Sequence, residues 1–217
     1  MEKVVILAPK ATTRCLLVRP RSLTGGKRCL AGALLASKAS MTSAPRIDFS
    51  SVEVRTRKGR ILEVRAYGVE DLGALVEMYK SFEPKRVAQG LPPSDVPRIA
   101  HWLEGLQGKA RALVVWDGAR VVAHIISCPI RTESVEFAVF VHQDYREEGL
   151  GTALSQLTLG WASRLGFPQV FLTTEFSNFP ALRLFRKLGF QITSRCADEC
   201  EMALDLAQAQ AALPRAA

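Results

Sequence analysis

The sequence predicts an α/β domain whose central mixed sheet is flanked by helices. An apolar strand at residues 137–141 leads through a glycine-spaced turn into a long amphipathic helix, and another apolar strand follows at residues 170–173. Two further apolar segments, residues 111–116 and 120–128, are joined by Asp117-Gly118, a strong signal for a two-residue hairpin. Strands joined both by hairpins and by helices indicate a sheet of mixed direction.

Length and composition agree with a single domain. The chain has 217 residues, of which 48% are hydrophobic, and this is enough for one core. We expect the folded domain to occupy residues 47–206. A basic extension at residues 1–46 precedes it, and a flexible tail rich in alanine and polar residues follows at residues 207–217.

The first half of the domain begins with a strand at residues 61–67, where apolar and polar side chains alternate. Glu70-Asp71 opens a helix that ends near Phe82. A proline-containing loop, residues 84–97, leads to a second short helix, after which the predicted hairpin begins. The apolar face of that second helix consists of Ile99, Trp102, Leu103 and Leu106.

The turn after the strand at residues 137–141 is suited to an anion. Leucines recur at helical spacing from Leu150, so the helix begins near Gly149. Unpaired N–H groups and the positive end of a helix dipole attract phosphate, and glycines allow the phosphate to approach closely. Arg146, Gly149 and Gly151 therefore predict a binding site for a pyrophosphate group.

The last two strands of the domain are expected at residues 189–194 and 198–206.

The net charge of +8 lies almost entirely outside this domain. Residues 1–40 hold eight basic side chains against Glu2 alone, whereas residues 41–217 hold 21 basic and 20 acidic side chains. A nearly neutral body argues against a nucleic-acid-binding face. The extension lacks periodicity and is interpreted as an organellar targeting segment, a weak secretory signal or sequence ahead of a true start at Met41.

Other sequence features favour a cytoplasmic protein that neither enters a membrane nor holds a metal. The longest uncharged apolar run falls well short of the ~18 residues typical of a membrane span. The five cysteines are odd in number and scattered, which is typical of free thiols in a reducing compartment. Their only close pair, Cys196 and Cys200, has no histidine partners, so no structural zinc is expected.

Two motifs, in the right order and at about the right distance, resemble the GNAT superfamily of N-acetyltransferases. R-E-E-G-L-G, residues 146–151, is similar to the family signature R/Q-x-x-G-x-G/A. N-F-P-A-L-R-L-F-R-K-L-G-F, residues 178–190, is similar to the family segment N-x-x-A-x-x-x-Y/F-x-K-x-G-F. The resemblance implies the GNAT fold, in which acetyl-CoA binds where two neighbouring parallel strands splay apart, and it implies no metal cofactor.

The resemblance also implies cofactor-binding residues. The strand around Val139 is expected to hold the pantetheine arm through its backbone, and the turn to hold the pyrophosphate. Arg146 could instead be a solvated surface cation, and Asn178 could act as a helix N-cap. Where the family often has a tyrosine that protonates the leaving thiolate, this chain has Phe185. The implied cofactor-binding residues are Val139, Phe140, Val141, Arg146, Glu147, Glu148, Gly149, Leu150, Gly151, Thr152, Asn178 and Phe185.

For catalysis the resemblance implies direct attack of a neutral amine on the thioester. A carboxylate is the natural base, because a lysine amine has a pKa of about 10.4 in solution. Glu136, at the start of the cofactor strand, is the first candidate and Glu175, at the end of the next strand, is the second. The acceptor is expected to be a protein lysine or a small amine, and the protein a monomer or homodimer. A non-catalytic acyl-CoA-binding sensor with the same fold is the alternative.

Overall fold

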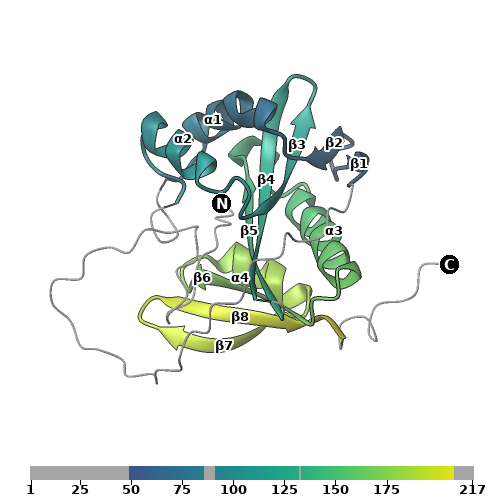
Figure 1. Cartoon of the computed structure of the whole chain (residues 1–217), viewed down its shortest axis with the longest axis vertical. Helices are drawn as coiled ribbons and strands as arrows, with labels where there is room; N and C mark the ends of the chain where they lie inside the picture. Colours follow the sequence, from purple (N-terminus) through teal and green to yellow (C-terminus); the bar gives the residue numbers. More distant parts are fainter. Residues whose placement is uncertain (1–48, 86–90, 132, 208–217) are drawn as a thin grey trace, which may run out of the picture.

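A computed structural model describes residues 49–85, 91–131 and 133–207 of the chain. Within these ranges a mixed sheet carries helices on both faces (Figure 1), as the sequence predicts. The strands are β1 (Val52–Arg55), β2 (Ile61–Ala66), β3 (Arg111–Asp117), β4 (Arg120–Arg131), β5 (Ser134–Val141), β6 (Gln169–Glu175), β7 (Gln191–Cys196) and β8 (Glu199–Asp205). The α-helices are α1 (Leu72–Ser81), α2 (Val96–Glu104), α3 (Leu150–Arg164) and α4 (Phe179–Lys187), and short 3-10 helices precede α1 (Val69–Asp71) and α3 (Gln143–Tyr145).

The sheet has the strand order β1-β2-β3-β4-β5-β6-β8-β7. Every neighbouring pair is antiparallel except β5 and β6, which run parallel and are connected through α3. Figure 1 shows β7 and β8 lying across one end of the long strands β4 and β5. Among the described strands, the one parallel pair therefore separates a five-stranded part of the sheet from a three-stranded part.

Alternation along β5 decides which helices cover which face. Phe140 packs against Tyr79 of α1 and Trp102 of α2, with ring centroids 5.4 and 5.7 Å apart. Phe137, three residues earlier and on the opposite face, packs against Phe185 of α4. Helices α1 and α2 therefore cover one face of the sheet and α4 covers the other. Helix α3, which connects β5 to β6, also packs against β5. Both faces of β5 are buried, which explains its continuous apolar sequence.

The observed elements differ from the predicted ones mainly at their ends. β1 has too few residues for a clear pattern and was not predicted. The helix expected to open at Glu70-Asp71 begins as a 3-10 turn, and α1 proper starts at Leu72. β7 starts two residues later than predicted, because Gly189 has a φ of +93° and belongs to the turn that ends α4.

Several expectations concern parts of the chain outside this description. The extension at residues 1–46 and most of the tail at residues 207–217 lie outside the described residues. Among the described helices, none has the length and apolar composition needed to cross a lipid bilayer.

Candidate functional site

The parallel pair β5–β6 is joined over only a short length. Their registered partners are residues 134–136 of β5 and 169–171 of β6, and neither strand pairs with the other beyond Glu136 and Phe171. From there β5 continues beside β4 and β6 continues beside β8. The two strands consequently splay apart beyond Glu136, which stands at the apex of the resulting cleft.

Along β5, the backbone N–H and C=O groups of successive residues point alternately toward β4 and toward the cleft. His142 donates its N–H to the carbonyl of Val122, so even-numbered β5 residues such as Phe140 form hydrogen bonds with β4. The N–H and C=O groups of Val139 and Val141 consequently point toward the cleft. Of these groups, the Val141 carbonyl accepts a hydrogen bond from Arg146 Nε at 2.9 Å. Val139 can therefore pair with an extended ligand, whereas Phe140 contributes its ring to the core.

The glycine turn opens α3 as the sequence predicts. Gly149 is the N-cap and has a φ of +84°, a conformation that favours glycine over other residues. The first N–H groups of α3 have no partners within the helix and point out of its end. A Cβ built on Gly151 would lie 3.5 Å from Leu184 and 3.9 Å from Val141, two residues that line the adjoining cavity. A side chain at Gly151 would thus occupy space that a phosphate could fill.

That cavity, which we call the turn pocket, has a volume of about 180 Å³ and is strongly cationic. Its basic residues are Arg57, Arg146, Arg183 and Lys187, and Glu147 is the one carboxylate among the described residues that line it. The remaining lining residues are Val141, Tyr145, Gly149, Leu150, Gly151, Thr152, Pro180 and Leu184. Converging cations beside unpaired N–H groups fit a polyphosphate ligand, so the pocket suits the pyrophosphate of acetyl-CoA.

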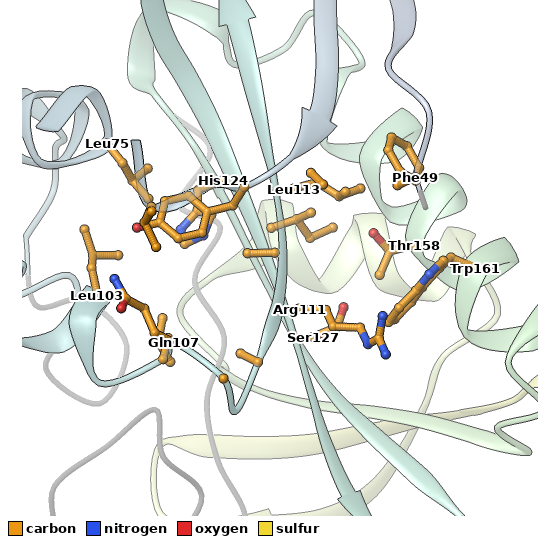
Figure 2. Close-up of a pocket in the computed structure, with 18 residues that line it drawn as sticks. Phe49, Leu75, Leu103, Gln107, Arg111, Leu113, His124, Ser127, Thr158 and Trp161 are labelled. Atoms are coloured by element: carbon orange, nitrogen blue, oxygen red, sulfur yellow. The ribbon is translucent and has the colours of Figure 1, made fainter. Parts of the chain in front are cut away.

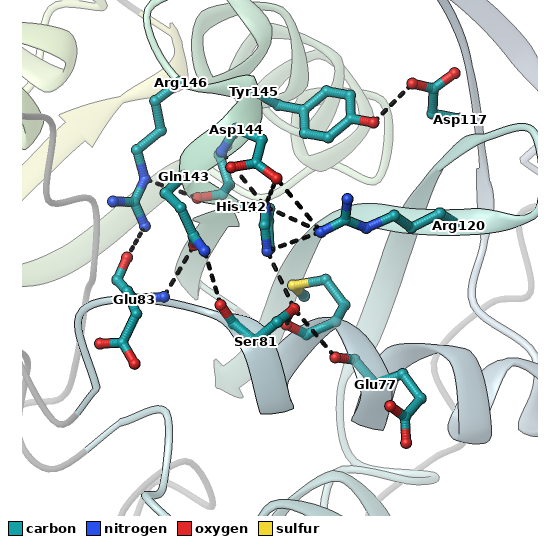
Figure 3. Close-up of polar contacts among 12 residues, drawn as sticks. Glu77, Ser81, Glu83, Asp117, Arg120, His142, Gln143, Asp144, Tyr145 and Arg146 are labelled. Atoms are coloured by element: carbon teal, nitrogen blue, oxygen red, sulfur yellow. Dashed lines mark hydrogen bonds and ion pairs between the residues drawn. The ribbon is translucent and has the colours of Figure 1, made fainter.

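Arg146 also fastens the turn to the end of α1 (Figure 3). Besides Val141, its guanidinium donates to the carbonyl of Glu83, and it lies 5.0 Å from the centre of the Phe82 ring. Gln143 reinforces this link, because its amide donates to the Ser81 carbonyl at 2.7 Å and accepts from the Glu83 N–H at 2.9 Å. Arg146 is thus both a pocket cation and a structural clamp.

His142 and Asp144 occupy the same turn and have structural partners. The His142 ring is buried and lies 3.2 Å from the Ser81 hydroxyl and 3.0 Å from Arg120 (Figure 3). Burial lowers the pKa of His142 and outweighs the opposing effect of the Asp144 carboxylate. Asp144 also pairs with Arg120 at 3.5 Å.

Two residues of the second motif have clear packing roles. The Asn178 side chain accepts a hydrogen bond from the Ala181 N–H at 3.3 Å and so caps α4, which is the alternative role that the sequence offered. Phe185 is fully buried and packs edge-to-face against Phe137 and Phe190. Its ring belongs to the core and does not line the turn pocket.

Glu148 lies in the turn, but its side chain points away from the pocket. The carboxylate is completely buried and pairs with Lys58 at 3.2 Å and Arg60 at 3.5 Å. Burial raises the pKa of Glu148, but the Thr56 side chain and the positive charges of Lys58 and Arg60 outweigh it, so the net shift of the pKa is downward. Any contact of Glu148 with a ligand in the pocket must therefore come from its backbone.

The two candidate bases occupy different places in the cleft. Glu136 is fully buried at the apex and shares the sheet face of Phe140, which α1 and α2 cover. Glu175 lies four residues beyond Phe171 along β6, roughly 13 Å further from the apex. Its carboxylate accepts a hydrogen bond from the Ser177 hydroxyl at 3.0 Å. The two carboxylates are too far apart to act on the same atom.

A second cavity, the β3 cavity, has a volume of about 300 Å³ and curves around the first residues of β3 (Figure 2). Leu75, Leu103, Gln107 and His124 line one side of it, and Trp161 of α3 lies on the other. No carboxylate is present among the described residues of its lining, and Arg111 stacks over Trp161 at 5.3 Å. The cavity is therefore mostly apolar, with a few polar groups.

His124 connects this cavity to the strand beside the cleft. Its Nδ1 lies 2.9 Å from the Tyr79 hydroxyl, and its ring stacks on Phe140 of β5 with centroids 6.4 Å apart. Burial lowers the pKa of His124 to about 3, so the ring is neutral at pH 7. A neutral, hydrogen-bonded histidine here has a structural role.

Sequence reasoning missed three of the basic residues that line the turn pocket. Arg183 and Lys187 stand four residues apart on one face of α4, inside the quoted second motif, and their helical spacing was a usable signal. Arg57 comes from the unpredicted β1–β2 hairpin, about 90 residues before the turn, and no local pattern indicated that it would lie there.

Among the described residues, no group of three or more His, Cys, Asp or Glu side chains could hold a metal ion.

Comparisons with known proteins give a consistent result. Residues 74–190, more than half of the chain, match the family model described as Acetyltransferase (GNAT) family. The curated protein N-acetyltransferase family 8 member 3 of Rattus norvegicus is 38% identical over 53 residues, which are 24% of this chain and 23% of that protein. The chain thus matches less than a quarter of that relative's length.

Solved structures share the fold. The GNAT domain of PAT from S. lividans has a TM-score of 0.59 at 18% identity, covering 71% of this chain and 96% of that one. A putative acetyltransferase of Salmonella typhimurium, determined with acetyl-CoA, has a TM-score of 0.56 at 24% identity, covering 67% and 94%. The spermidine/spermine N-acetyltransferase SpeG of Vibrio cholerae has a TM-score of 0.58 at 16% identity, covering 70% and 97%. These likenesses confirm the predicted fold class.

Proposed function

Because the chain belongs to the Acetyltransferase (GNAT) family, we propose that this acyltransferase moves the acetyl group of acetyl-CoA to the nitrogen of a primary amine. The observation that carries the proposal is a splayed strand pair whose open end adjoins a glycine turn and a cationic pocket. Bound acetyl-CoA supplies the thioester carbonyl that the amine attacks.

The positions of the glycine turn and of the apex determine the orientation in which acetyl-CoA lies in the cleft. Its pyrophosphate accepts hydrogen bonds from the N–H groups at the start of α3, and the pantetheine amides pair with the backbone of Val139. The thioester is at the opposite end of the cofactor from the phosphates. It therefore lies toward the apex, where Glu136 stands.

Glu136 is the proposed general base. The amine nitrogen attacks the thioester carbon, an N–C bond forms and the C–S bond breaks. The proton of the amine passes to the Glu136 carboxylate, directly or through a water molecule, and CoA leaves as the thiolate. Its position at the apex supports Glu136 over Glu175, which is roughly 13 Å further along β6.

The leaving thiolate needs little help from a general acid. A free thiol has a pKa of about 8.5, so the thiolate is a tolerable leaving group near neutral pH. The burial of Phe185 in the core is compatible with this mechanism, since no residue has to replace the tyrosine that the family often has there.

The β3 cavity supports a small amine with an apolar body as the acceptor. One lobe lies on the face of the sheet that carries Glu136, and His124 at its wall contacts Phe140 of β5. A polyamine would bring additional ammonium groups beside Arg111, with no carboxylate among the described lining residues to pair with them. Unpaired buried charge is strongly unfavourable, so we favour hydrophobic monoamines over spermidine.

An acceptor screen tests the function. Purified protein is mixed with acetyl-CoA and one amine at a time, and release of CoA thiol is followed. We expect turnover with 2-phenylethylamine or hexylamine to exceed that with spermidine. Replacing Ala112, which lines the cavity, by Leu should raise the KM for these amines at least about tenfold and leave acetyl-CoA affinity unchanged. A preference for spermidine would contradict the acceptor class.

A non-catalytic acyl-CoA-binding sensor remains the second candidate, favoured by the absence of a tyrosine at position 185. Such a protein would bind acetyl-CoA in calorimetry but release no thiol above the rate without protein, whichever amine is added. Thiol release that depends on both protein and amine would exclude it.

A further inference from the structure

The β1–β2 hairpin ends in a tight turn that projects one arginine. The Thr56 N–H donates to the Arg60 carbonyl and the Gly59 N–H to the Thr56 carbonyl, both at 2.9 Å. Gly59 has a φ of +84°, as expected for the glycine of a three-residue hairpin loop. The loop residues Arg57 and Lys58 are exposed at its tip.

This hairpin is attached to the glycine turn by a buried carboxylate. The Arg57 N–H donates to the Glu148 carbonyl at 2.8 Å, and the Glu148 carboxylate pairs with Lys58 and Arg60. A buried carboxylate is unfavourable unless its charge is compensated. Because Lys58 and Arg60 provide that compensation, Glu148 fixes the hairpin tip relative to the start of α3.

The attachment places the Arg57 side chain directly over the turn. A Cβ built on Gly149 would lie 3.3 Å from Arg57 Nε, and Arg57 lines the turn pocket together with Arg183 and Lys187 of α4. The fourth cation, Arg146, already donates to the Val141 and Glu83 carbonyls.

The number of cations exceeds what a pyrophosphate at a helix end requires. The first N–H groups of α3 and the glycine turn offer hydrogen-bond donors to the pyrophosphate, and Arg146 lies in the same turn. Arg57, Arg183 and Lys187 line the same pocket, where Glu147 is the one carboxylate among the described lining residues. Coenzyme A carries a further phosphate on its ribose, a monoester with a charge of about −1.5 to −2 at pH 7.

We propose that Arg57, Arg183 and Lys187 form a cradle for the 3′-phosphate of coenzyme A, and that Glu148 is the positioning residue that holds Arg57 in it. The proposal rests on the function proposed above. It makes the β1–β2 hairpin a specificity element, by which the protein distinguishes coenzyme A from its 3′-dephospho form.

Calorimetry with coenzyme A and with 3′-dephospho-coenzyme A tests the cradle. The natural protein should bind coenzyme A at least about tenfold more tightly. Arg57→Ala should weaken coenzyme A binding about tenfold and change dephospho-coenzyme A binding less than about threefold. Arg55→Ala, which removes the same charge from an exposed site on β1 outside the pocket, should change neither affinity.

The role of Glu148 has its own variants. Glu148→Gln should reduce the preference for coenzyme A as Arg57→Ala does, although Glu148 makes no side-chain contact with the pocket. Lys58→Ala, at an exposed position, loosens the same ion pair and serves if Glu148→Gln does not fold. A Glu148 variant that folds and retains the full preference would overturn the positioning role.

The other outcomes are separable. Equal affinity of the natural protein for both ligands, or equal losses for both in Arg57→Ala, would overturn the 3′-phosphate assignment and leave acetyl transfer intact. If the natural protein binds neither ligand, the proposed function itself fails, and the cradle fails with it.

Discussion

Gly149 and Gly151 lie two positions apart, but their backbone conformations differ in whether they allow a residue other than glycine. Gly149 has a φ of +84°, so any other residue there is strained whether or not a ligand binds. Gly151 is helical, and a Cβ on it would make ordinary contacts with Leu184 and Val141. Gly151 is therefore the better position at which to test phosphate binding.

Gly151→Val should weaken acetyl-CoA binding at least about tenfold, or about 1.4 kcal/mol, because its branched side chain occupies the turn pocket. The midpoint of thermal unfolding should change little. Gly160→Val provides a matched control, since Gly160 lies on the same helix with no other atom within 4 Å of a built Cβ. Unchanged affinity in a folded Gly151→Val protein, measured by calorimetry, would argue against phosphate binding at this turn.

Phe185→Tyr adds a hydroxyl to a buried ring that packs edge-to-face against Phe137 and Phe190. Burying an unpaired hydroxyl costs about 1–3 kcal/mol, so we expect the thermal midpoint to fall by several degrees. Turnover with the best amine should not rise more than a few fold, because the thiolate leaves readily without an acid. Differential scanning calorimetry and thiol release measure the two effects. A large gain in turnover would instead place the new hydroxyl beside the leaving sulfur.

At the scale of elements, β5 provides both a candidate base and the backbone groups that line the cleft. Successive residues of the strand point in different directions, so the two roles do not interfere. Glu136, Ala138 and Phe140 point their side chains toward α1 and α2, while the intervening residues point toward α3 and α4. Because β6 leaves β5 after Glu136, the same strand offers a carboxylate at the apex and backbone groups along the cleft. A base and a binding edge thus come from one strand.

Glu136→Gln retains the size of the side chain but cannot accept a proton. The rate of acetyl transfer to an amine should therefore fall by about 10² or more, while acetyl-CoA affinity is retained. Glu175→Gln should have a much smaller effect, given its distance from the apex. Steady-state kinetics with both variants decides between them. A nearly natural rate in Glu136→Gln with a large loss in Glu175→Gln would transfer the role to Glu175.

At the scale of the whole molecule, His124 makes stability depend on pH. Its pKa of about 3 in the folded protein lies below the ordinary 6.5, because burial disfavours the charged ring. The unfolded chain therefore binds a proton at higher pH than the folded one does. The stabilisation is complete above pH 6.5 and is lost progressively as pH falls toward 3.

When the pH falls from about 7.5 to about 5, His124 binds a proton in the unfolded chain but not in the folded protein. This difference should lower the free energy of unfolding by about 2 kcal/mol. Urea unfolding at the two pH values measures the change. His124→Gln removes the titrating group, so its pH-dependent loss should be smaller by about that amount, even though the variant loses core packing and is less stable overall. Equal losses in both proteins would mean that His124 does not bind a proton on unfolding.

We also expect residues 1–40 to be dispensable for folding and chemistry, because they show neither periodicity nor a coherent apolar face. A chain that starts at Met41 should unfold cooperatively and bind acetyl-CoA with an affinity within about threefold of the full chain. Circular dichroism melts and calorimetry check both properties. Loss of either would show that the extension docks on the domain.

The sequence alone determined the features that depend on neighbours along the chain. The strand ending at Val141, the turn and the helix beginning at Leu150 follow from local periodicity and from glycines whose conformational freedom is intrinsic. Asn178 was predictable as a cap for the same reason, since an N-cap bonds to a backbone group three residues away.

Tertiary structure decided what depends on residues far apart in the sequence. The position of Arg57 over Gly149, the buried pairing of Glu148 with the hairpin, and the splay that puts Glu136 at the apex all arise from strand order and register. Whether Phe185 lies in the core or beside a ligand was likewise fixed by the packing of α4 on β5. Local patterns carry no information on such contacts, because the energies that select them come from burial and charge pairing across the folded chain.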